Sequence, residues 1–149
     1  MPEKEVVERA RRDAQEGKAP STQAGEFVRE EFEHVREGKH GARSPQQAIA
    51  IGLSKARRAG VKLPLPKKGR TSAKTRRQAA RDLRKGRTKT KTVSAKRSRA
   101  VSNALRLEGR SSASHSAISA QARKSARKRG SAGRHKAAAK AARTRQRRR

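Results

Sequence analysis

The first sixty residues carry apolar side chains three and four positions apart, which is the spacing of one face of an α-helix. The earliest such stripe runs from Val6 to Ala14. Pro2 suits the first turn of a helix, and Gly17 suits a left-handed stop after the last turn. The pattern therefore predicts a first helix between Pro2 and Gly17.

A second stripe, of five apolar residues, lies between positions 24 and 35. Ser21 or Thr22 can cap the helix that this stripe predicts, and Gly38 follows its end. One acidic residue, Glu31, interrupts the stripe, and the pattern supplies no reason for it.

The most specific helix signal begins at Ser44, where the sequence Ser-Pro-Gln-Gln forms a capping box. In such a box the Ser44 hydroxyl accepts from the Gln47 amide, and the Gln47 side chain reaches back to the Ser44 amide. Gly60, followed by Val61, predicts the end of this helix. The small residues along one face, which would let another helix approach closely, are Ala48, Gly52 and Ala56.

We expect an all-α protein that consists of a small three-helix N-terminal module and a basic tail. The module covers residues 2–63, and the linker 64–69 contains two prolines that favour an extended chain. Leu, Ile, Val and Phe account for about 12% of the residues, which is too little to fill a core along the whole chain. We therefore expect the tail, residues 70–149, to be disordered or conditionally helical on a polyanion, with helix-forming stretches at 73–85, 95–108, 115–129 and 134–148.

Charge is divided unevenly along the chain. Lys and Arg number 43 against 12 Asp and Glu, a formal net charge of +31. Residues 1–60 nearly balance, with 12 basic and 10 acidic side chains, whereas the other 31 basic residues face only Asp82 and Glu108. This excess predicts a polyanionic partner, nucleic acid. Phe27 and Phe32 belong to the second helical stripe, and Tyr and Trp are absent, so duplex DNA is favoured over single strands, with structured RNA as the alternative.

Basic residues of the module lie at the two ends of the third predicted helix. Lys39, His40 and Arg43 precede it, where free amides and the positive end of the helix dipole can hold a phosphate; an ordinary connecting loop is the alternative. The predicted exposed face with Gln47 and Ser54 leaves base reading in a helix-turn-helix manner as a further alternative. The candidates in or after the last turn of this helix are Lys55, Arg57, Arg58 and Lys62.

The linker and the tail supply the larger set of candidate contacts to nucleic acid. Their basic side chains surround the predicted helical stretches instead of forming one reading face, which predicts contacts to the phosphate backbone without sequence preference. These candidates are Lys67, Lys68, Arg76, Arg77, Arg81, Arg84, Lys85, Lys96, Arg97, Arg99, Arg123, Lys124, Arg127, Lys128, Arg129, Arg143 and Arg147.

Other kinds of chemistry lack their residues. The chain has no Cys, and its four His residues are scattered, so we expect no metal site and no cofactor. No phosphate-loop motif and no nucleophile paired with a base occurs, so we expect no catalytic residues, no small-molecule substrate and no enzyme activity. The longest apolar run has six residues and the N-terminus lacks a signal-peptide pattern. We therefore expect no membrane span and a cytoplasmic, nucleoid-associated protein.

Three runs stand out in the module: STQAGEFVREE at 21–31, REGKHGARS at 36–44 and QAIAIGLSKARRAGVKLP at 47–64. In these runs the chain resembles a small bacterial family of uncharacterised function. The tail, above all HKAAAKAA at 135–142, is similar in composition to linker-histone tails and to the histone-like tails of some bacterial proteins. The first resemblance implies no activity, and the second implies association with the nucleoid.

We expect non-enzymatic, largely sequence-independent binding of nucleic acid in a nucleoid-associated or histone-like role. An RNA- or ribosome-associated accessory protein is one alternative. Another is an adaptor whose helical module docks a protein partner or a second copy of the chain, while the tail supplies electrostatic anchoring. Attachment to an anionic membrane ranks last, because the tail lacks an amphipathic face with large apolar residues.

Overall fold

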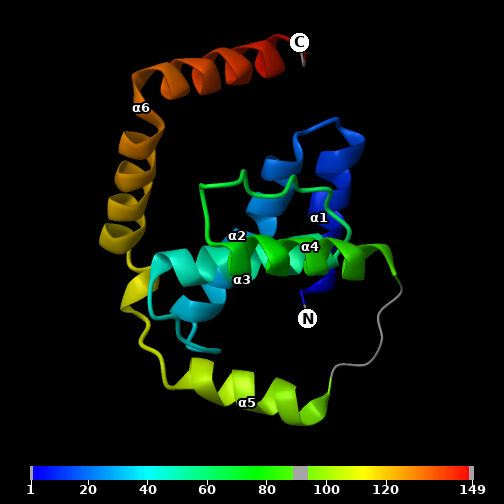
Figure 1. The fold of residues 1–149 in the computed structure, drawn as a ribbon, viewed down its shortest axis with the longest axis vertical. Helices are drawn as coiled ribbons and strands as arrows, with labels where there is room; N and C mark the ends of the chain where they lie inside the picture. The colour runs from blue at the N-terminus through cyan, green and yellow to red at the C-terminus, as the bar shows by residue number, and fades with distance from the viewer. Residues whose placement is uncertain (1, 89–93, 148–149) are drawn as a thin grey trace. The chain divides into compact units, whose positions relative to one another are not determined.

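The computed structural model describes residues 2–88 and 94–147, and these two ranges hold six α-helices and no β-strand (Figure 1). The all-α class is therefore confirmed for the described residues. The chain divides into two compact units, one up to Ala113 and one from Ser114. The elements are α1 (Lys4–Gln15), α2 (Pro20–Arg36), α3 (Pro45–Arg58), α4 (Ala73–Arg87), α5 (Ala95–Arg106), the short 3-10 helix η1 (Ser111–Ala113) and α6 (His115–Gln146).

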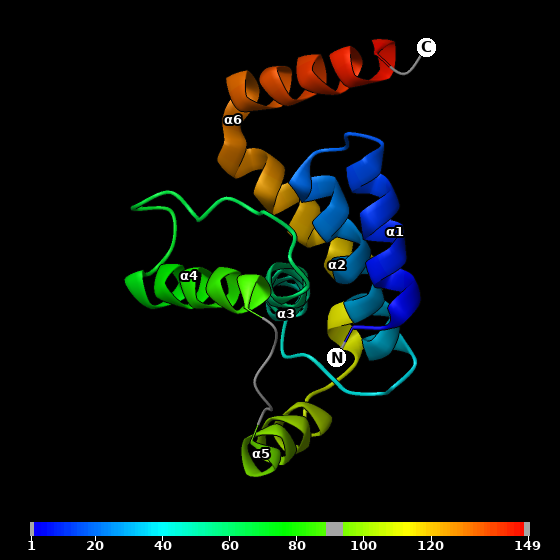
Figure 2. The same ribbon diagram turned by 90° about the vertical axis from the view of Figure 1, so that its right-hand side faces the viewer.

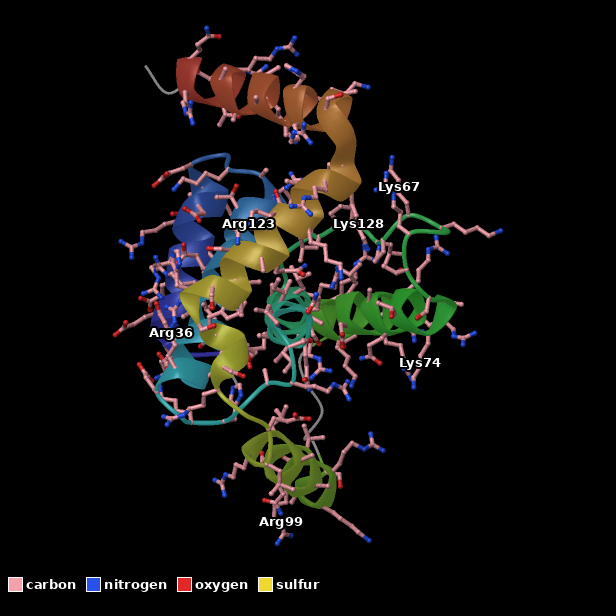
Figure 3. The ribbon with its side chains drawn as sticks, turned by 90° about the vertical axis from the view of Figure 1, so that its left-hand side faces the viewer. Arg36, Lys67, Lys74, Arg99, Arg123 and Lys128 are labelled. Carbon is pink, nitrogen blue, oxygen red and sulfur yellow. The ribbon has the colours of Figure 1, made fainter. Side chains whose placement is uncertain are left out.

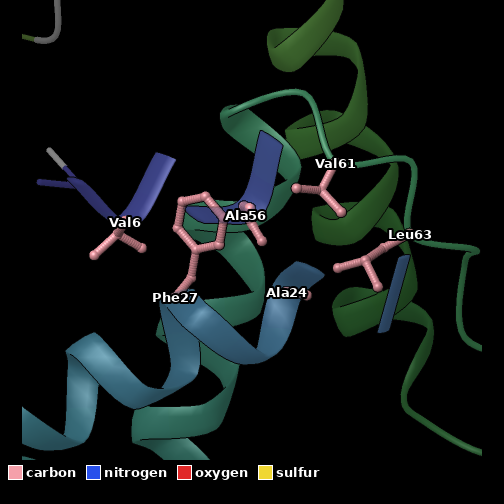
Figure 4. Packing of buried hydrophobic residues seen from close by; sticks show 7 residues of the cluster. Val6, Ala24, Phe27, Ala56, Val61 and Leu63 are labelled. Carbon is pink, nitrogen blue, oxygen red and sulfur yellow. The ribbon is translucent and has the colours of Figure 1, made fainter. Parts of the chain in front are cut away.

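Helices α1, α2 and α3 enclose the hydrophobic core of the first unit. Phe27 and Ala56 are fully buried at its centre, and Val6, Val61 and Leu63 close it from three sides (Figure 4). The apolar stripes predicted for these helices thus face one another. The core contains few large side chains, so it supplies modest stability on its own.

The crossing of α2 and α3 depends on a glycine. A Cβ atom on Gly52 would lie 2.7 Å from the Val28 Cα and 2.9 Å from the Phe27 carbonyl oxygen, which is closer than such atoms can approach. The predicted role of the small face of α3 is therefore confirmed. Figure 2 shows α3 nearly end-on, with α2 on one side and α4 on the other.

The predicted signals at the ends of α3 are present, with one change. The Ser44 hydroxyl accepts from the Gln47 amide at 3.3 Å, as expected of the cap. The Gln47 side chain reaches one residue further than predicted and accepts from the Arg43 amide at 2.8 Å. At the other end, Gly60 has φ 96° and its amide donates to the Arg57 carbonyl, while the amide of Val61 donates to Ala56, which is the bonding of a glycine helix stop.

The predicted starts of the first two helices are wrong by a few residues. Helix α1 begins at Lys4, with Glu3 at the capping position. Helix α2 begins at Pro20 and no side chain caps it, so neither Ser21 nor Thr22 has the predicted role. Pro20 has no N–H and presets the helical φ, and the Ala19 carbonyl accepts from the amides of Thr22 and Gln23, so the first turn forms without a side-chain cap.

Helix α4 packs against α3, so the expectation of a disordered tail is wrong for this segment. Asp82 is 1% exposed and accepts hydrogen bonds from the Ser54 hydroxyl and from Arg58 Nε, each at 2.8 Å. A Cβ atom on Gly86 would collide with the Arg57 carbonyl, so the two backbones touch. The buried carboxylate of Asp82 and the close backbone contact at Gly86 therefore attach this basic helix to the module.

The segment after α5 also belongs to the first unit. The Gly41 amide donates to the Leu105 carbonyl at 2.9 Å, and the Ala42 amide donates to the Gly109 carbonyl at 3.0 Å. Arg36 Nε donates to the Ala113 carbonyl at 3.0 Å. The compact unit thus extends well beyond residue 63, where the sequence analysis ends the helical module.

Helix α6 forms the second unit and is another correction to the expected disorder. The Ser114 hydroxyl caps it by accepting from the Ala117 amide at 3.2 Å, and its Ala, Arg and Lys residues are good helix formers. At Gly130, φ is 67° and ψ is 175°, which divides the helix into two segments close to the predicted stretches. Whether a polyanion adds further helix stays a prediction, and residues 89–93 and 148–149 of the tail lie outside the described residues.

Within the described ranges, no helix combines the length and the apolar character that crossing a membrane requires.

The glycine at the α2–α3 crossing gives a first prediction. Gly52→Ala will lower the free energy of unfolding by about 1–3 kcal/mol, because the added methyl group forces two backbones apart. Chemical denaturation followed by far-ultraviolet circular dichroism measures this change. The matched control is Gly25→Ala on α2, where nothing lies within 4 Å. That variant should gain about 0.5–1 kcal/mol from helix propensity, and equal behaviour of the two variants would contradict the packing.

The attachment of α4 gives a second prediction. Asp82→Ala removes the shared acceptor of Ser54 and Arg58, and it will destabilise the α3–α4 contact by about 1–3 kcal/mol. Hydrogen exchange of the α4 amides should accelerate strongly, while the amides of α1 and α2 keep their protection. Arg81→Ala, one residue away and exposed, is the control and should leave both sets unchanged.

Candidate functional site

The predicted nucleic-acid contacts fall into two structural classes. Most residues of the first class lie in the module and are paired with acids inside the protein. Residues of the second class lie on the outer faces of the linker and of α4, α5 and α6.

Lys55 belongs to the first class. Its side chain is 20% exposed, and Nζ lies 3.3 Å from Glu30 Oε2 and 2.8 Å from Glu31 Oε2. Both glutamates are almost fully buried. An ammonium held between two buried carboxylates offsets one of their two negative charges and pairs with both, so the structure gives Lys55 a role in holding α3 against α2.

Arg57 and Arg58 also belong to the first class, because Arg58 pairs with an acid and Arg57 is buried. Arg58 Nε donates to Asp82, although half of the Arg58 side chain remains exposed. Arg57 is 9% exposed and its Nε has no hydrogen-bond partner among the described residues. Burial lowers the pKa of Arg57, an effect that the negative charge of Asp82 partly opposes. A guanidinium stays protonated at neutral pH, so Arg57 remains a buried positive charge behind α4.

The proposed phosphate cradle before α3 has few free amides. The Gly41 amide donates to Leu105 in the last turn of α5, the Ala42 amide donates to Gly109 after that helix, and the Arg43 amide donates to Gln47. Lys39 Nζ lies 3.0 Å from Glu37 and 3.1 Å from Glu3, and these two carboxylates raise the pKa of Lys39. Of the three residues expected there, Lys39 and His40 pair with acids, whereas Arg43 is exposed and forms no ion pair with the described residues.

The second class begins with Lys62, Lys67 and Lys68, which are exposed, and continues along α4. The basic residues of α4 that were predicted to contact nucleic acid are all exposed: Arg76, Arg77, Arg81, Arg84 and Lys85. The acidic residue of this helix, Asp82, faces α3 instead. The solvent face of α4 is therefore basic along its whole length.

Helix α5 has the same outward character. It has no buried residue, and Lys96, Arg97 and Arg99 are exposed. Figure 3 shows the labelled side chains of Lys67, Lys74 and Arg99 extending away from the ribbon.

Helix α6 is basic on all sides. It has no buried residue and no acidic residue, and its hydrophobic residues do not gather on one face. Arg147 follows the last turn and is exposed. The basic side chains along the helix are Arg123, Lys124, Arg127, Lys128, Arg129, Arg134, Lys136, Lys140, Arg143 and Arg145.

One cluster was missed by the sequence analysis. The expectation that the histidines are scattered is wrong for His34 and His40, whose rings lie edge to face with centroids 5.9 Å apart. A ligand atom of each, together with a carboxylate oxygen of Glu31, lies within 4.8 Å of the other two. The side chain of His34 is only 12% exposed.

A second group, formed by Glu3, Glu30 and His34, shares His34 with this cluster. Nε2 of His34 lies 3.1 Å from Glu3 Oε1, and the Glu3 amide donates to Glu30 Oε1 at 2.6 Å. Hydrogen bonds from His34 and then from Lys39 lower the pKa of Glu3, so this half-exposed carboxyl stays ionised further into acid. The sequence signal for the cluster was the spacing of Glu31 and His34, since residues three apart share a helix face. The return of His40 depends on the turn at Gly38, whose φ is 77°.

Comparison with known proteins bears on the module and not on the tail. Residues 4–69 match the sequence model of DUF6496, a family of unknown function. This match spans α1, α2, α3 and the linker, and it supports the resemblance of the N-terminal part to an uncharacterised family. The search of curated proteins and the search of solved structures gave no match.

The pairing of Lys55 gives a third prediction. Lys55→Gln leaves Glu30 and Glu31 buried without their shared cation, and it will cost about 3 kcal/mol of unfolding free energy. Thermal and chemical unfolding of the full chain measures this loss. Lys62→Gln, which changes an exposed lysine close by in sequence, is the control and should change stability by less than about 0.5 kcal/mol. Equal stability of the two variants would contradict this pairing, and Lys55 would again be a candidate contact to nucleic acid.

Proposed function

We propose that this protein binds nucleic acid, duplex DNA in preference to single strands, through the outer basic faces of α4, α5 and α6, and that it does so without catalysing a reaction. The observation that supports this most is the direction of the acidic side chains. In the described part of the chain after residue 60, Asp82 is buried and Glu108 is half-buried, whereas the exposed faces of the helices carry Lys and Arg.

Helix α4 turns its acidic side chain inward and its basic side chains outward. Asp82 is 1% exposed and its carboxylate is held by α3, so no acidic group on α4 offsets its outward cations. Arg77, Arg84 and Lys85 are exposed on this helix. Phosphates neutralised by such side chains release condensed counterions, which drives binding.

The distribution of charge favours contacts to the backbone over base reading. On α6 the basic side chains lie on every side of the helix, so no narrow face is dedicated to base edges. Phosphate contacts position a protein on the duplex and carry no sequence information directly. We therefore propose sequence-independent binding, in keeping with a nucleoid-associated role.

The position of the aromatic residues disfavours single strands as the ligand. Phe27 is fully buried and Phe32 is 9% exposed, and the sequence contains no Tyr or Trp. Proteins that hold single strands commonly stack bases on exposed aromatic rings. The structure offers no such ring among the described residues, so a double-helical phosphate surface is the better ligand.

The fourth prediction concerns the salt dependence of binding to duplex DNA. The triple variant Arg77→Gln, Arg84→Gln and Lys85→Gln will weaken binding, and it will flatten the plot of log K against log salt by about 2–3 units, at about 0.9 per lost phosphate contact. Fluorescence anisotropy with a labelled duplex across a salt series measures this slope. The variant changes exposed side chains only, so its fold should be kept.

A matched control changes three exposed basic residues of α1, as Lys4→Gln, Arg11→Gln and Arg12→Gln, and should keep the slope. Equal slopes for both triple variants and the wild type would contradict the proposed interface on α4. Competition between duplex DNA and a folded RNA at matched salt then decides the polymer. Preferential binding of the RNA would replace duplex DNA in the proposal.

A further inference from the structure

We propose that Glu31, His34 and His40 form a binding site for a divalent transition-metal ion, with Zn²⁺ as the ion that suits this donor set. The proposal concerns the module alone and does not depend on nucleic-acid binding. Two imidazoles and one carboxylate are the protein ligands of many zinc sites, and imidazole suits borderline divalent metals generally.

The distances allow a shared ion after small adjustments. One potential ligand atom from each of the three residues lies within 4.8 Å of the other two. With bonds of about 2.0–2.1 Å, the ligand atoms of a tetrahedral zinc ion lie about 3.4 Å apart. Side-chain rotations can close this difference, because His40 sits in a loop beyond the end of α2.

The hydrogen bonding of His40 leaves a lone pair directed at a carboxylate. Nδ1 of His40 lies 3.0 Å from the Gly41 carbonyl, which can only accept, so Nδ1 carries the proton. Nε2 lies 2.9 Å from Glu31 Oε1; the protonated ring donates to that oxygen as an ion pair, whereas in the neutral ring the Nε2 lone pair faces the carboxylate and can ligate an ion. A ring nitrogen that donates to a backbone carbonyl while the other ligates is the usual arrangement of a metal-bound histidine.

Glu31 is the independent observation that calls for a cation at this point. Its side chain is 1% exposed, and neither carboxylate oxygen makes a hydrogen bond of good geometry in the described chain. Lys55 Nζ is close to Oε2, at 2.8 Å, and compensates that oxygen by charge. Oε1 lies 2.9 Å from His40 Nε2, so an ion bound by both residues would take the place of this His40–Glu31 contact.

The surrounding groups fit the charge of a divalent ion. Glu3 lies against Nε2 of His34 at 3.1 Å, and such a carboxylate orients a histidine beside a metal. The acids Glu3, Glu30 and Glu31 outnumber Lys39 and Lys55, with which they pair. The cluster is thus locally negative in a chain of net charge +31.

A bound ion would fasten the loop 37–44 to α2. The same loop donates two backbone hydrogen bonds, from Gly41 to the last turn of α5 and from Ala42 to the segment after it. The ion would therefore connect α2 with the start of the basic C-terminal region. Its expected contribution is to stability, since metal binding to a folded site is folding free energy.

The test uses the full chain after treatment with a strong chelator. Competition with a chromophoric zinc chelator should show uptake of one Zn²⁺ per chain, and Co²⁺ should give the intense visible absorption of a four- or five-coordinate ion. Added Zn²⁺ should also raise the melting temperature. The large positive charge of the chain repels adventitious cations, so uptake of one equivalent identifies a specific site.

Variants assign the ligands. His40→Gln and Glu31→Gln should each weaken Zn²⁺ binding on the order of 100-fold or more, while the double control His115→Gln with His135→Gln, on α6, should bind as the wild type does. Failure of the wild type to bind Zn²⁺ in the competition, or a Co²⁺ spectrum like that of the hydrated ion, would overturn the site. These two wild-type measurements decide the matter even if a ligand variant fails to fold. Retained binding in His40→Gln, with loss in the α6 control, would also overturn it.

Discussion

Buried carboxylates hold the first unit of this protein together. Asp82 joins α4 to α3, and Glu30 with Glu31 joins α2 to Lys55 on α3. A buried carboxylate without its partner is strongly unfavourable, so each of these acids restricts how the helices can be arranged. Asp82 faces α3, which leaves the outer surface of α4 without negative charge. One set of interactions therefore determines both the packing of the helices and the electrostatics that they present to solvent.

Close contact between backbones complements these ion pairs. The core contains few large apolar residues, and Gly52, Gly86 and Gly41 lie where a Cβ atom would strike a neighbouring segment. Short helix separations increase dispersion contacts and let polar groups bond across the interface. A chain with a thin core is thus held by local fit and by buried charge more than by apolar volume.

The sequence predicted where the helices begin and end better than it predicted which residues contact one another across them. Ser44 and Gly60 mark the ends of α3 through local bonds, and local bonds leave a local signal. The partners of Asp82 lie 24 and 28 residues away along the chain, so the spacing of residues within the tail could not predict them. The same limit hid the approach of His40 to Glu31, and it made Lys55 look like a free surface cation. The disorder expected from composition is wrong for α4 because the buried Asp82 and the close contact at Gly86 attach this basic helix to α3.

The break at Gly130 has a consequence for how the C-terminal helix responds to its surroundings. Each of its two segments has about fifteen residues, near the length at which an isolated helix is marginally stable. Because Gly130 departs from helical φ and ψ, we expect unwinding of one segment to stop there and the two segments to melt independently. When one half engages a charged polymer, the other half remains nearby at high effective concentration and can release and rebind alone.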